Sequence, residues 1–234
     1  MDVATMRETV SHIDEGICKG RFMQHVVVNV AKLVNMKKDP QLDSSVRNSD
    51  IINIDGMGIV FGARFLGYKV PERVSGVDLF HELLSMSANK GYSVYLLGAE
   101  DNIVAETAKR SLELFPALQI AGYHNGYFWD DEESVVNSIR QSGAQLLFVA
   151  ITSPKKENFI NRWRDHLGVT FVMGVGGTFD VIAGKVKRAP KWMQSLGLEW
   201  LYRVIQEPRR MWKRYLLTNF KFAMMLTREK LFKS

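Results

Sequence analysis

Residues 53–58, Asn-Ile-Asp-Gly-Met-Gly, place an acid between a strand-like run and a helical one. The carboxylate of Asp55 would be well placed to accept a proton from a substrate hydroxyl, and the glycines leave room for a ligand beside the backbone. The same residue would serve equally well as a helix N-cap. Asn29 also ends a strand-like run and would lie near Asp55 in a parallel sheet, unless it is simply a turn residue.

A glycine-rich loop at residues 174–177 follows the last strand-like run. Its free backbone N–H groups could cradle a diphosphate, with Gly176 and Gly177 closest to the ligand and Asp180 just beyond them. The spacing is neither the dinucleotide fingerprint nor a Walker loop. It therefore argues against a nicotinamide dehydrogenase and a nucleoside triphosphatase.

Basic side chains stand near these motifs. Arg73 is either a forked phosphate donor or part of a surface ion pair with Glu72 or Asp78. A basic patch directly after the glycine-rich loop favours an anionic ligand; it consists of Lys185, Lys187 and Arg188.

Residues 130–133, Asp-Asp-Glu-Glu, could form a divalent metal site, but the pattern favours the acidic first turn of a helix. His124 could contact a ligand, but a lone histidine in a loop more often has a structural role. No Ser/His/Asp or Cys/His arrangement can be assembled, and we expect no metal and no cofactor.

Short apolar runs alternate with amphipathic segments along the chain, which predicts a Rossmann-like, mostly parallel sheet flanked by helices. Gly98 and Gly122 are expected in tight turns directly after strands. Ligands of such sheets bind beyond the carboxyl ends of the strands. The expected strands, buried on both faces, are 25–30, 50–54, 93–97, 118–121, 145–150 and 169–173, and the expected helices are 102–115, 132–141 and 155–166.

The chain divides near Pro190, where the strand-like runs stop, into an α/β core, 1–190, and a basic helical C-terminal appendage, 191–234. From residue 185 onward there are thirteen Lys and Arg against three Glu, interleaved with aromatic side chains, whereas the whole chain has a net charge of +6. This pattern suits an anionic lipid surface. Glu207-Pro208 should divide the appendage into two helices.

No run of eighteen apolar residues occurs, the N-terminus does not resemble a signal peptide, and Cys18 is the single cysteine. We therefore expect a cytoplasmic protein whose membrane contact is peripheral and not spanning. The expected membrane contacts are Trp212, Tyr215, Phe220 and Phe222, with Arg209, Arg210, Lys213 and Arg214 facing phosphates.

Five segments, taken in order, resemble the motifs of one family. They are residues 53–58, 72–79, 122–128, 174–190 and 198–208. Together they resemble the bacterial WecG/TagA/CpsF glycosyltransferases, glycosyltransferase family 26, with the greatest specificity between Gly174 and Pro208.

The resemblance implies an inverting, metal-independent enzyme that moves a sugar from a UDP-sugar to a polyprenyl-diphosphate-linked acceptor in polysaccharide biosynthesis. It also implies a location on the inner face of the plasma membrane. By motif, Asp55 matches the catalytic base, and Asn29 and Arg73 match pocket residues. Diphosphate contacts are implied for appendage arginines: Arg203 and, less closely matched, Arg209, Arg210 and Arg214.

Two positions depart from the family pattern. Relatives often have Thr where this chain has Val27, and commonly have Gln where it has Lys156, close to the donor sugar. An ammonium donates hydrogen bonds and adds charge, whereas an amide also accepts. We therefore hypothesise a donor other than N-acetylmannosamine, such as a carboxylated or plain hexose.

Two other readings remain open from the residues alone. The basic tail permits a nucleic-acid-binding protein, although no motif supports it. The α/β pattern permits a sugar-nucleotide oxidoreductase. A homo-oligomer is also consistent with a site on one face and an apolar appendage.

Overall fold

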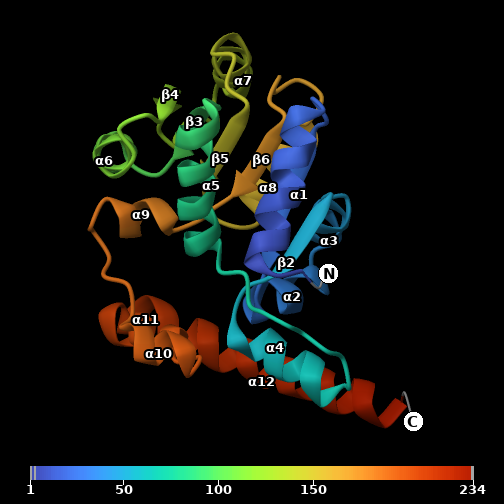
Figure 1. The fold of residues 1–234 in the computed structure, drawn as a ribbon. Helices are drawn as coiled ribbons and strands as arrows, with labels where there is room; N and C mark the ends of the chain where they lie inside the picture. Colours follow the sequence, from blue (N-terminus) through green and yellow to red (C-terminus); the bar gives the residue numbers. More distant parts are fainter. Residues whose placement is uncertain (1, 3, 233–234) are drawn as a thin grey trace.

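A computed structural model describes residues 2 and 4–232, without the side chains of Arg210 and Arg214. Six strands form one sheet in the order β2-β1-β6-β5-β3-β4, and every neighbouring pair is parallel. All six expected strands and the Rossmann-like class are confirmed (Figure 1). The strands are β1 (Met23–Val28), β2 (Ile51–Ile54), β3 (Ser93–Gly98), β4 (Gln119–His124), β5 (Leu146–Ala150) and β6 (Phe171–Gly174).

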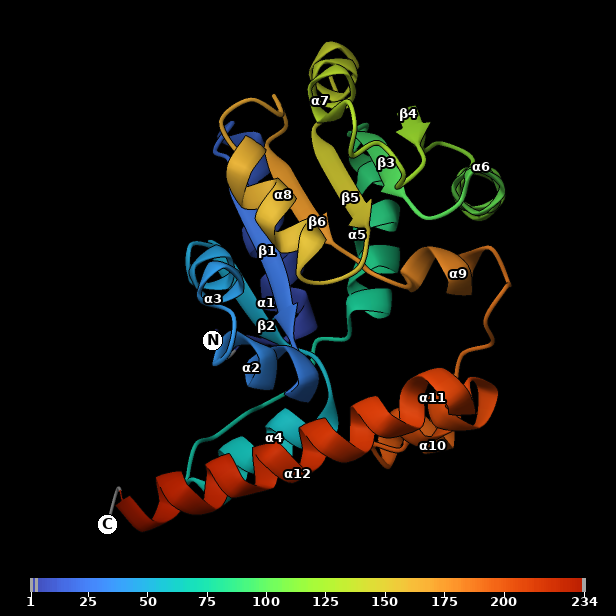
Figure 2. The same ribbon diagram turned by 180° about the vertical axis from the view of Figure 1, so that it is seen from behind.

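Helices cover both faces of the sheet (Figures 1 and 2). One face carries α1 (Met6–Cys18), α5 (Gly76–Lys90) and α6 (Asp101–Leu114), and the other carries α3 (Pro40–Arg47), α7 (Glu132–Gln141) and α8 (Lys155–Trp163). Three short helices follow strand ends directly: α2 (Val30–Met36), α4 (Met57–Phe65) and α9 (Thr178–Ile182). The three helices expected from the sequence correspond to α6, α7 and α8.

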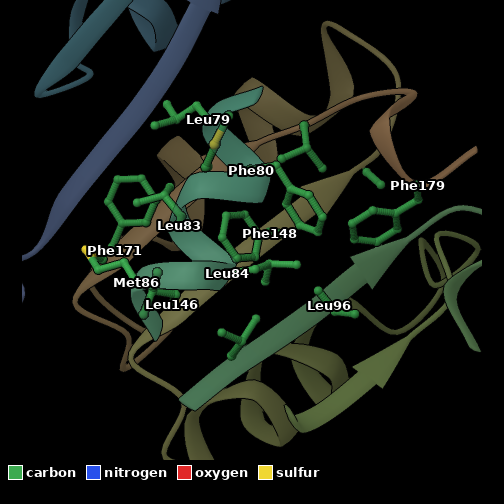
Figure 3. Packing of buried hydrophobic residues seen from close by; sticks show 14 of the residues in the cluster. Leu79, Phe80, Leu83, Leu84, Met86, Leu96, Leu146, Phe148, Phe171 and Phe179 are labelled. Atoms are coloured by element: carbon green, nitrogen blue, oxygen red, sulfur yellow. The ribbon is translucent and has the colours of Figure 1, made fainter. Parts of the chain in front are cut away.

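The central strands are buried on both faces because alternate side chains enter different hydrophobic clusters. In β5, Phe148 packs on the α5 side, whereas Leu147 packs against α7 and α8. Figure 3 shows Phe148 beside Phe80 of α5, with ring centroids 4.7 Å apart in an edge-to-face arrangement. This core holds the carboxyl ends of the strands in fixed register.

Strand β4 differs from expectation. It is the edge strand, and its side chains alternate between exposed and half-buried instead of being buried on both faces. Gly122 lies inside β4 and not in a turn after it, where a Cβ would come within 2.7 Å of the Tyr95 ring. Gly98, the last residue of β3, does occupy the expected tight position, with a φ of +120°.

The appendage comprises α10 (Lys191–Ser195), α11 (Glu199–Gln206) and α12 (Pro208–Phe232), so the break at Glu207-Pro208 is confirmed. Figures 1 and 2 show these helices together with α4 beyond the carboxyl ends of the strands. Helix α12 packs against α2 and α4. The appendage is therefore joined to the α/β unit through a shared hydrophobic cluster.

Helix α12 has an inner and an outer apolar face. On the inner face, Phe222 is 8% exposed and its ring occupies the space left by Gly62 of α4, where a Cβ would come within 2.6 Å. Phe222 is therefore not available as a membrane contact, contrary to expectation. The outer face repeats every four residues, with exposed Trp212, Leu216, Phe220 and Met224. Tyr215 is half-buried and lies against Trp200.

In the described part of the chain, no helix combines the length and apolarity that crossing a membrane requires.

Candidate active site

Asp55 lies at the carboxyl end of β2, beside Asn29 at the end of β1. Its backbone N–H donates a 3.0 Å hydrogen bond to the Val28 carbonyl, one residue beyond the in-register pair Val28–Ile54. Gly56 then turns the chain into α4 with a φ of +109°, a conformation that favours glycine. The Asp55 side chain is half-buried and accepts no hydrogen bond from the described residues.

Burial raises the pKa of Asp55 to about 6, while the positive charge of Arg73 acts in the opposite direction and that of Glu199 adds to the rise. A carboxyl with this pKa is ionised at neutral pH and still basic enough to accept a proton. Asp55 caps no helix, since α4 lacks a side-chain cap. The geometry therefore favours chemistry over capping at this position.

Asn29 does cap a helix. Its Oδ1 accepts a 3.0 Å hydrogen bond from the Lys32 backbone N–H and so begins α2. Its Cβ also lies 3.7 Å from the point that a Cβ on Gly56 would occupy. Asn29 is thus both the turn residue and the immediate neighbour of the Asp55 segment.

An ion-pair network links this edge of the sheet to the appendage. Arg73 Nη1 lies 3.1 Å from Glu199 Oε2 at the start of α11. Arg188 Nε lies 3.6 Å from the other oxygen of Glu199, and Arg188 Nη2 donates to Asp78 Oδ2 of α5 at 2.7 Å. The suggested pairs of Arg73 with Glu72 or Asp78 are not formed; its described partner is Glu199.

The glycine-rich loop after β6 faces Arg203 of α11. Gly176 has a φ of +55°, and the space beside Gly177 is bordered by the Arg203 guanidinium and the Asp180 carboxylate, 3.5 and 3.8 Å from where a Cβ would stand. Arg203 makes no ion pair with the described residues. Gly177, Asp180 and Arg203 are therefore brought together as the sequence predicts, with a guanidinium available to an anion.

The basic patch is largely neutralised by neighbours. Lys185 lies 3.1 Å from Glu100 and 3.9 Å from Asp180, and Arg188 is held by Asp78 and Glu199. Lys187 remains exposed. The available positive charge at this edge comes more from Arg203 than from the patch. The side chains of Arg210 and Arg214 lie outside the described residues, and Arg209 is exposed.

Lys156 belongs to a buried charge cluster with Glu157 and Lys32. Glu157 Oε1 lies 2.8 Å from Lys32 Nζ and 2.9 Å from Lys156 Nζ, and all three side chains are almost fully buried. Lys32 also donates to the Val27 carbonyl at 2.7 Å. The Lys156 stem crosses Gly174, where a Cβ would come within 2.9 Å. Its ammonium therefore faces Glu157 in the interior.

Lys32 of this cluster and Asp55 affect each other's pKa. Burial, reinforced by the charge of Lys156, lowers the pKa of Lys32 to about 8, with Glu157 and Asp55 acting in the opposite direction. Burial alone would raise the pKa of Glu157, but the two lysines outweigh it and lower that pKa to about 2. Sequence reasoning missed Lys32, although a lone lysine among Val30, Ala31, Leu33 and Val34 was a usable signal.

Other candidate residues have structural roles. Asp131 caps α7, as favoured for the acidic run, and Glu132 pairs with Arg162. His124 is hydrogen-bonded to the Asn125 carbonyl and lies edge-on to Phe128. Within the described residues, no group of three or more His, Cys, Asp or Glu side chains is arranged to hold a metal ion.

A single parallel sheet with helices on both faces defines a Rossmann-like α/β protein, and an acid, a glycine-rich loop and arginines at the carboxyl edge of that sheet form its candidate ligand site. The sequence matches the family described as "Glycosyl transferase WecG/TagA/CpsF family" over residues 1–234. The chain therefore belongs to this family of glycosyltransferases, which confirms the resemblance.

Two relatives carry the name "N-acetylglucosaminyldiphosphoundecaprenol N-acetyl-beta-D-mannosaminyltransferase". The protein from Bacillus spizizenii is 35% identical over 210 residues, covering 88% of this chain and 80% of that protein. The protein from Bacillus subtilis (strain 168) is 35% identical over 192 residues, covering 82% and 74%.

The buried cluster predicts unequal effects of two similar substitutions. Glu157→Gln leaves two buried ammonium groups without a carboxylate and should lower the free energy of unfolding by about 3–5 kcal/mol. Lys156→Gln keeps the Lys32–Glu157 pair and should change the free energy of unfolding by about 1 kcal/mol or less. Urea unfolding at pH 7 measures both, with exposed Glu133→Gln as the control. Equal losses for the two cluster variants would contradict the expected dependence on Glu157.

Proposed function

We propose that this glycosyltransferase moves a hexose from a UDP-sugar to a polyprenyl-diphosphate-linked saccharide in bacterial cell-surface polysaccharide synthesis, with inversion and with Asp55 as the base. The observation that carries the proposal is the half-buried Asp55, with its raised pKa, near Arg73 and at the same carboxyl edge of the sheet as the glycine-rich loop. The names of the two Bacillus relatives support an acceptor that carries a sugar on a polyprenyl diphosphate.

In the proposed reaction, Asp55 takes the proton of the acceptor hydroxyl while its oxygen attacks the anomeric carbon of the donor. The bond between that carbon and the UDP oxygen breaks from the opposite side, and UDP leaves as an anion. Arg203 and the backbone N–H groups around Gly176 and Gly177 would stabilise the departing diphosphate. The cluster of Lys32, Glu157 and Lys156 adds one net positive charge nearby. No metal ion is required in this scheme.

The donor is proposed to be a hexose other than N-acetylmannosamine. Val27 and Lys156 stand on two of the strand-end segments that surround the site, and Val27 lies against the start of α5 at Gly76, 3.7 Å from where a Cβ would be. A threonine there would add a hydroxyl that valine lacks. The buried position of Lys156 means that it would act on the donor through its charge more than by direct contact.

Peripheral membrane attachment through the appendage is part of the proposal. The outer face of α12 combines exposed apolar side chains with cations that lie over aromatic rings, such as Lys213 over Trp212 at 5.7 Å and Arg228 over Phe232 at 5.9 Å. Helix α4 extends this surface, with Lys230 lying 5.6 Å over Phe65. Cations and aromatic rings together suit the headgroup region of an anionic bilayer.

A donor panel tests the reaction itself. Purified enzyme should transfer sugar from a UDP-hexose to a short-chain prenyl-diphosphate N-acetylglucosamine, with product mass and anomeric configuration read by mass spectrometry and NMR. We expect an inverted linkage and a higher kcat/KM for a plain or carboxylated hexose than for UDP-N-acetylmannosamine. Exclusive use of the latter would contradict the donor hypothesis, and a retained configuration would contradict the single-displacement mechanism.

Loss of the proposed base should affect turnover and leave UDP binding intact. Asp55→Asn is expected to lower kcat by about 10³-fold, within the usual range for general-base catalysis. In the wild-type enzyme, activity should fall as the pH drops below about 6, because the base works only when deprotonated. Initial rates between pH 5 and 8 and UDP titration measure these effects. The control is Asp43→Asn on α3; a similar kcat for Asp55→Asn and this control would remove Asp55 from the base role.

Vesicle flotation tests the membrane contact. Trp212→Glu with Phe220→Glu should reduce flotation with phosphatidylglycerol vesicles about tenfold at 0.1 M salt, because both side chains lie on the outer face of α12. The matched control, Tyr123→Glu with Leu114→Glu, changes exposed side chains elsewhere and should float like the wild type. Unchanged flotation of the first pair, or stronger retention on nucleic acid than on vesicles at equal salt, would contradict the membrane proposal.

A further inference from the structure

An open groove runs from the candidate active site along helix α4 to the outer surface. Its first part, a hollow of about 370 Å³, lies between α4, residues 71–73 and the end of α10 at Gln194 and Ser195. Its second part, of about 600 Å³, lies beside residues 67–71. Both parts are bordered by Arg64 and Pro71, so they adjoin. We call this feature the α4 groove.

The two ends of the α4 groove differ in chemistry. Its inner end is bordered by Arg73, the charged residue with the largest effect on the Asp55 carboxyl. At the outer end lie Lys69 and Tyr68, the latter 55% exposed, shortly after the exposed Phe65 at the end of α4. A ligand that follows the groove would therefore have its charged part at the site and its far end at an aromatic, cationic surface.

The walls between the ends are apolar with one central cation. Met57, Val60 and Pro71 form the apolar walls, and Arg64 reaches across to donate a 3.3 Å hydrogen bond to the Val70 carbonyl. The one acid on the rim, Glu72, accepts from the Met6 backbone N–H at the start of α1 and is thereby directed to that helix. The groove thus offers apolar contact along its length and positive charge at intervals.

This combination suits an isoprenoid diphosphate. In the proposed reaction the acceptor must bring its sugar hydroxyl to Asp55, while its hydrocarbon chain must leave the site toward the membrane. An uncovered chain would cross water at a cost proportional to its apolar area. The groove begins at a site residue and ends near the surface proposed to meet the bilayer, so it offers the chain apolar contact, interrupted by Arg64, between them.

We propose that the α4 groove binds the first isoprene units of the acceptor, with the acceptor diphosphate at the Arg73 end and the chain leaving past Tyr68. This inference rests on the proposed function, because the ligand is the lipid-linked acceptor of that reaction. It adds a chain-binding subsite built by the α/β unit and by α10, separate from the contact of α12 with the bilayer.

Direct binding in solution tests the groove without a membrane. The probes are geranylgeranyl diphosphate, with four isoprene units, and isopentenyl diphosphate, with one, both titrated below the micelle-forming concentration and followed by tryptophan fluorescence. The wild type should bind the longer probe at least about tenfold more tightly, since each buried methylene group contributes about 0.8 kcal/mol. Inorganic diphosphate measures the contribution of the head group.

Two exposed positions allow the groove to be changed without disturbing the core. Tyr68→Asp places a carboxylate at its outer end and should lower the affinity for geranylgeranyl diphosphate about tenfold, while the affinity for isopentenyl diphosphate stays unchanged. Ser195→Trp fills its inner part, where the diphosphate and the first isoprene unit would lie, and should lower the affinity for both probes. Tyr123→Asp is the matched control, because Tyr123 is 51% exposed on β4, away from the groove. Thermal unfolding of each variant verifies that it is folded.

Transfer assays separate this inference from the proposed function. In Tyr68→Asp, KM for a four-isoprene acceptor should rise about tenfold, while KM for the UDP-sugar and for a one-isoprene acceptor stays constant. In Ser195→Trp, KM should rise for acceptors of both lengths and stay constant for the UDP-sugar. Transfer with a KM independent of chain length would contradict chain binding in the α4 groove and would still support the proposed function. Length-dependent binding with no transfer from any UDP-sugar would contradict the proposed function and would still support chain binding in the α4 groove. Variants that bind geranylgeranyl diphosphate normally but lose vesicle flotation would overturn the groove in favour of bilayer contact.

Discussion

The ion-pair network of Arg73, Glu199, Arg188 and Asp78 holds the C-terminal helices against the carboxyl edge of the sheet. Glu199 begins α11, and Arg203 follows it by four residues on the same helical face. Anchoring Glu199 therefore also sets the position of the Arg203 guanidinium beside Gly177. The same network places a positive and a negative charge near Asp55, so it influences the pKa of that carboxyl as well as the position of the C-terminal helices.

Charge balance around Asp55 has a functional consequence. In the proposed reaction, a carboxylate base would work beside a donor diphosphate and an acceptor diphosphate, both negatively charged. Burial alone would favour the neutral acid, whereas Arg73 and Lys32 favour the ionised base. Lys32 can remain in the interior because Glu157 pairs with it and with Lys156. The buried cluster thus keeps net positive charge under the site without opening it to solvent.

Helix α12 serves two surfaces at once. Phe222 and Met211 face inward, where Phe222 completes the cluster between α2 and α4, while Trp212 and Phe220 face outward. An apolar side chain in this helix is therefore not by itself evidence for either role. The arrangement also helps to hold the appendage against the α/β unit, because Met211, Thr218 and Phe222 on its inner face are buried. Helix α4 takes part on both sides, contacting α12 through Gly62 and bordering the groove through Met57 and Arg64.

The sequence by itself determined the features that depend on local pattern. Strand–helix alternation, the break at Pro208, and the strand-end positions of Asn29, Asp55 and Gly176 follow from periodicity, from proline and from glycine. Tertiary structure decided which side chains meet. Glu199 pairs with Arg73 across 126 residues, Lys32 joins Glu157, and Phe222 turns inward over Gly62. These contacts join residues far apart in the chain, and their energy depends on burial and distance, which exist only once the sheet and the appendage have packed together.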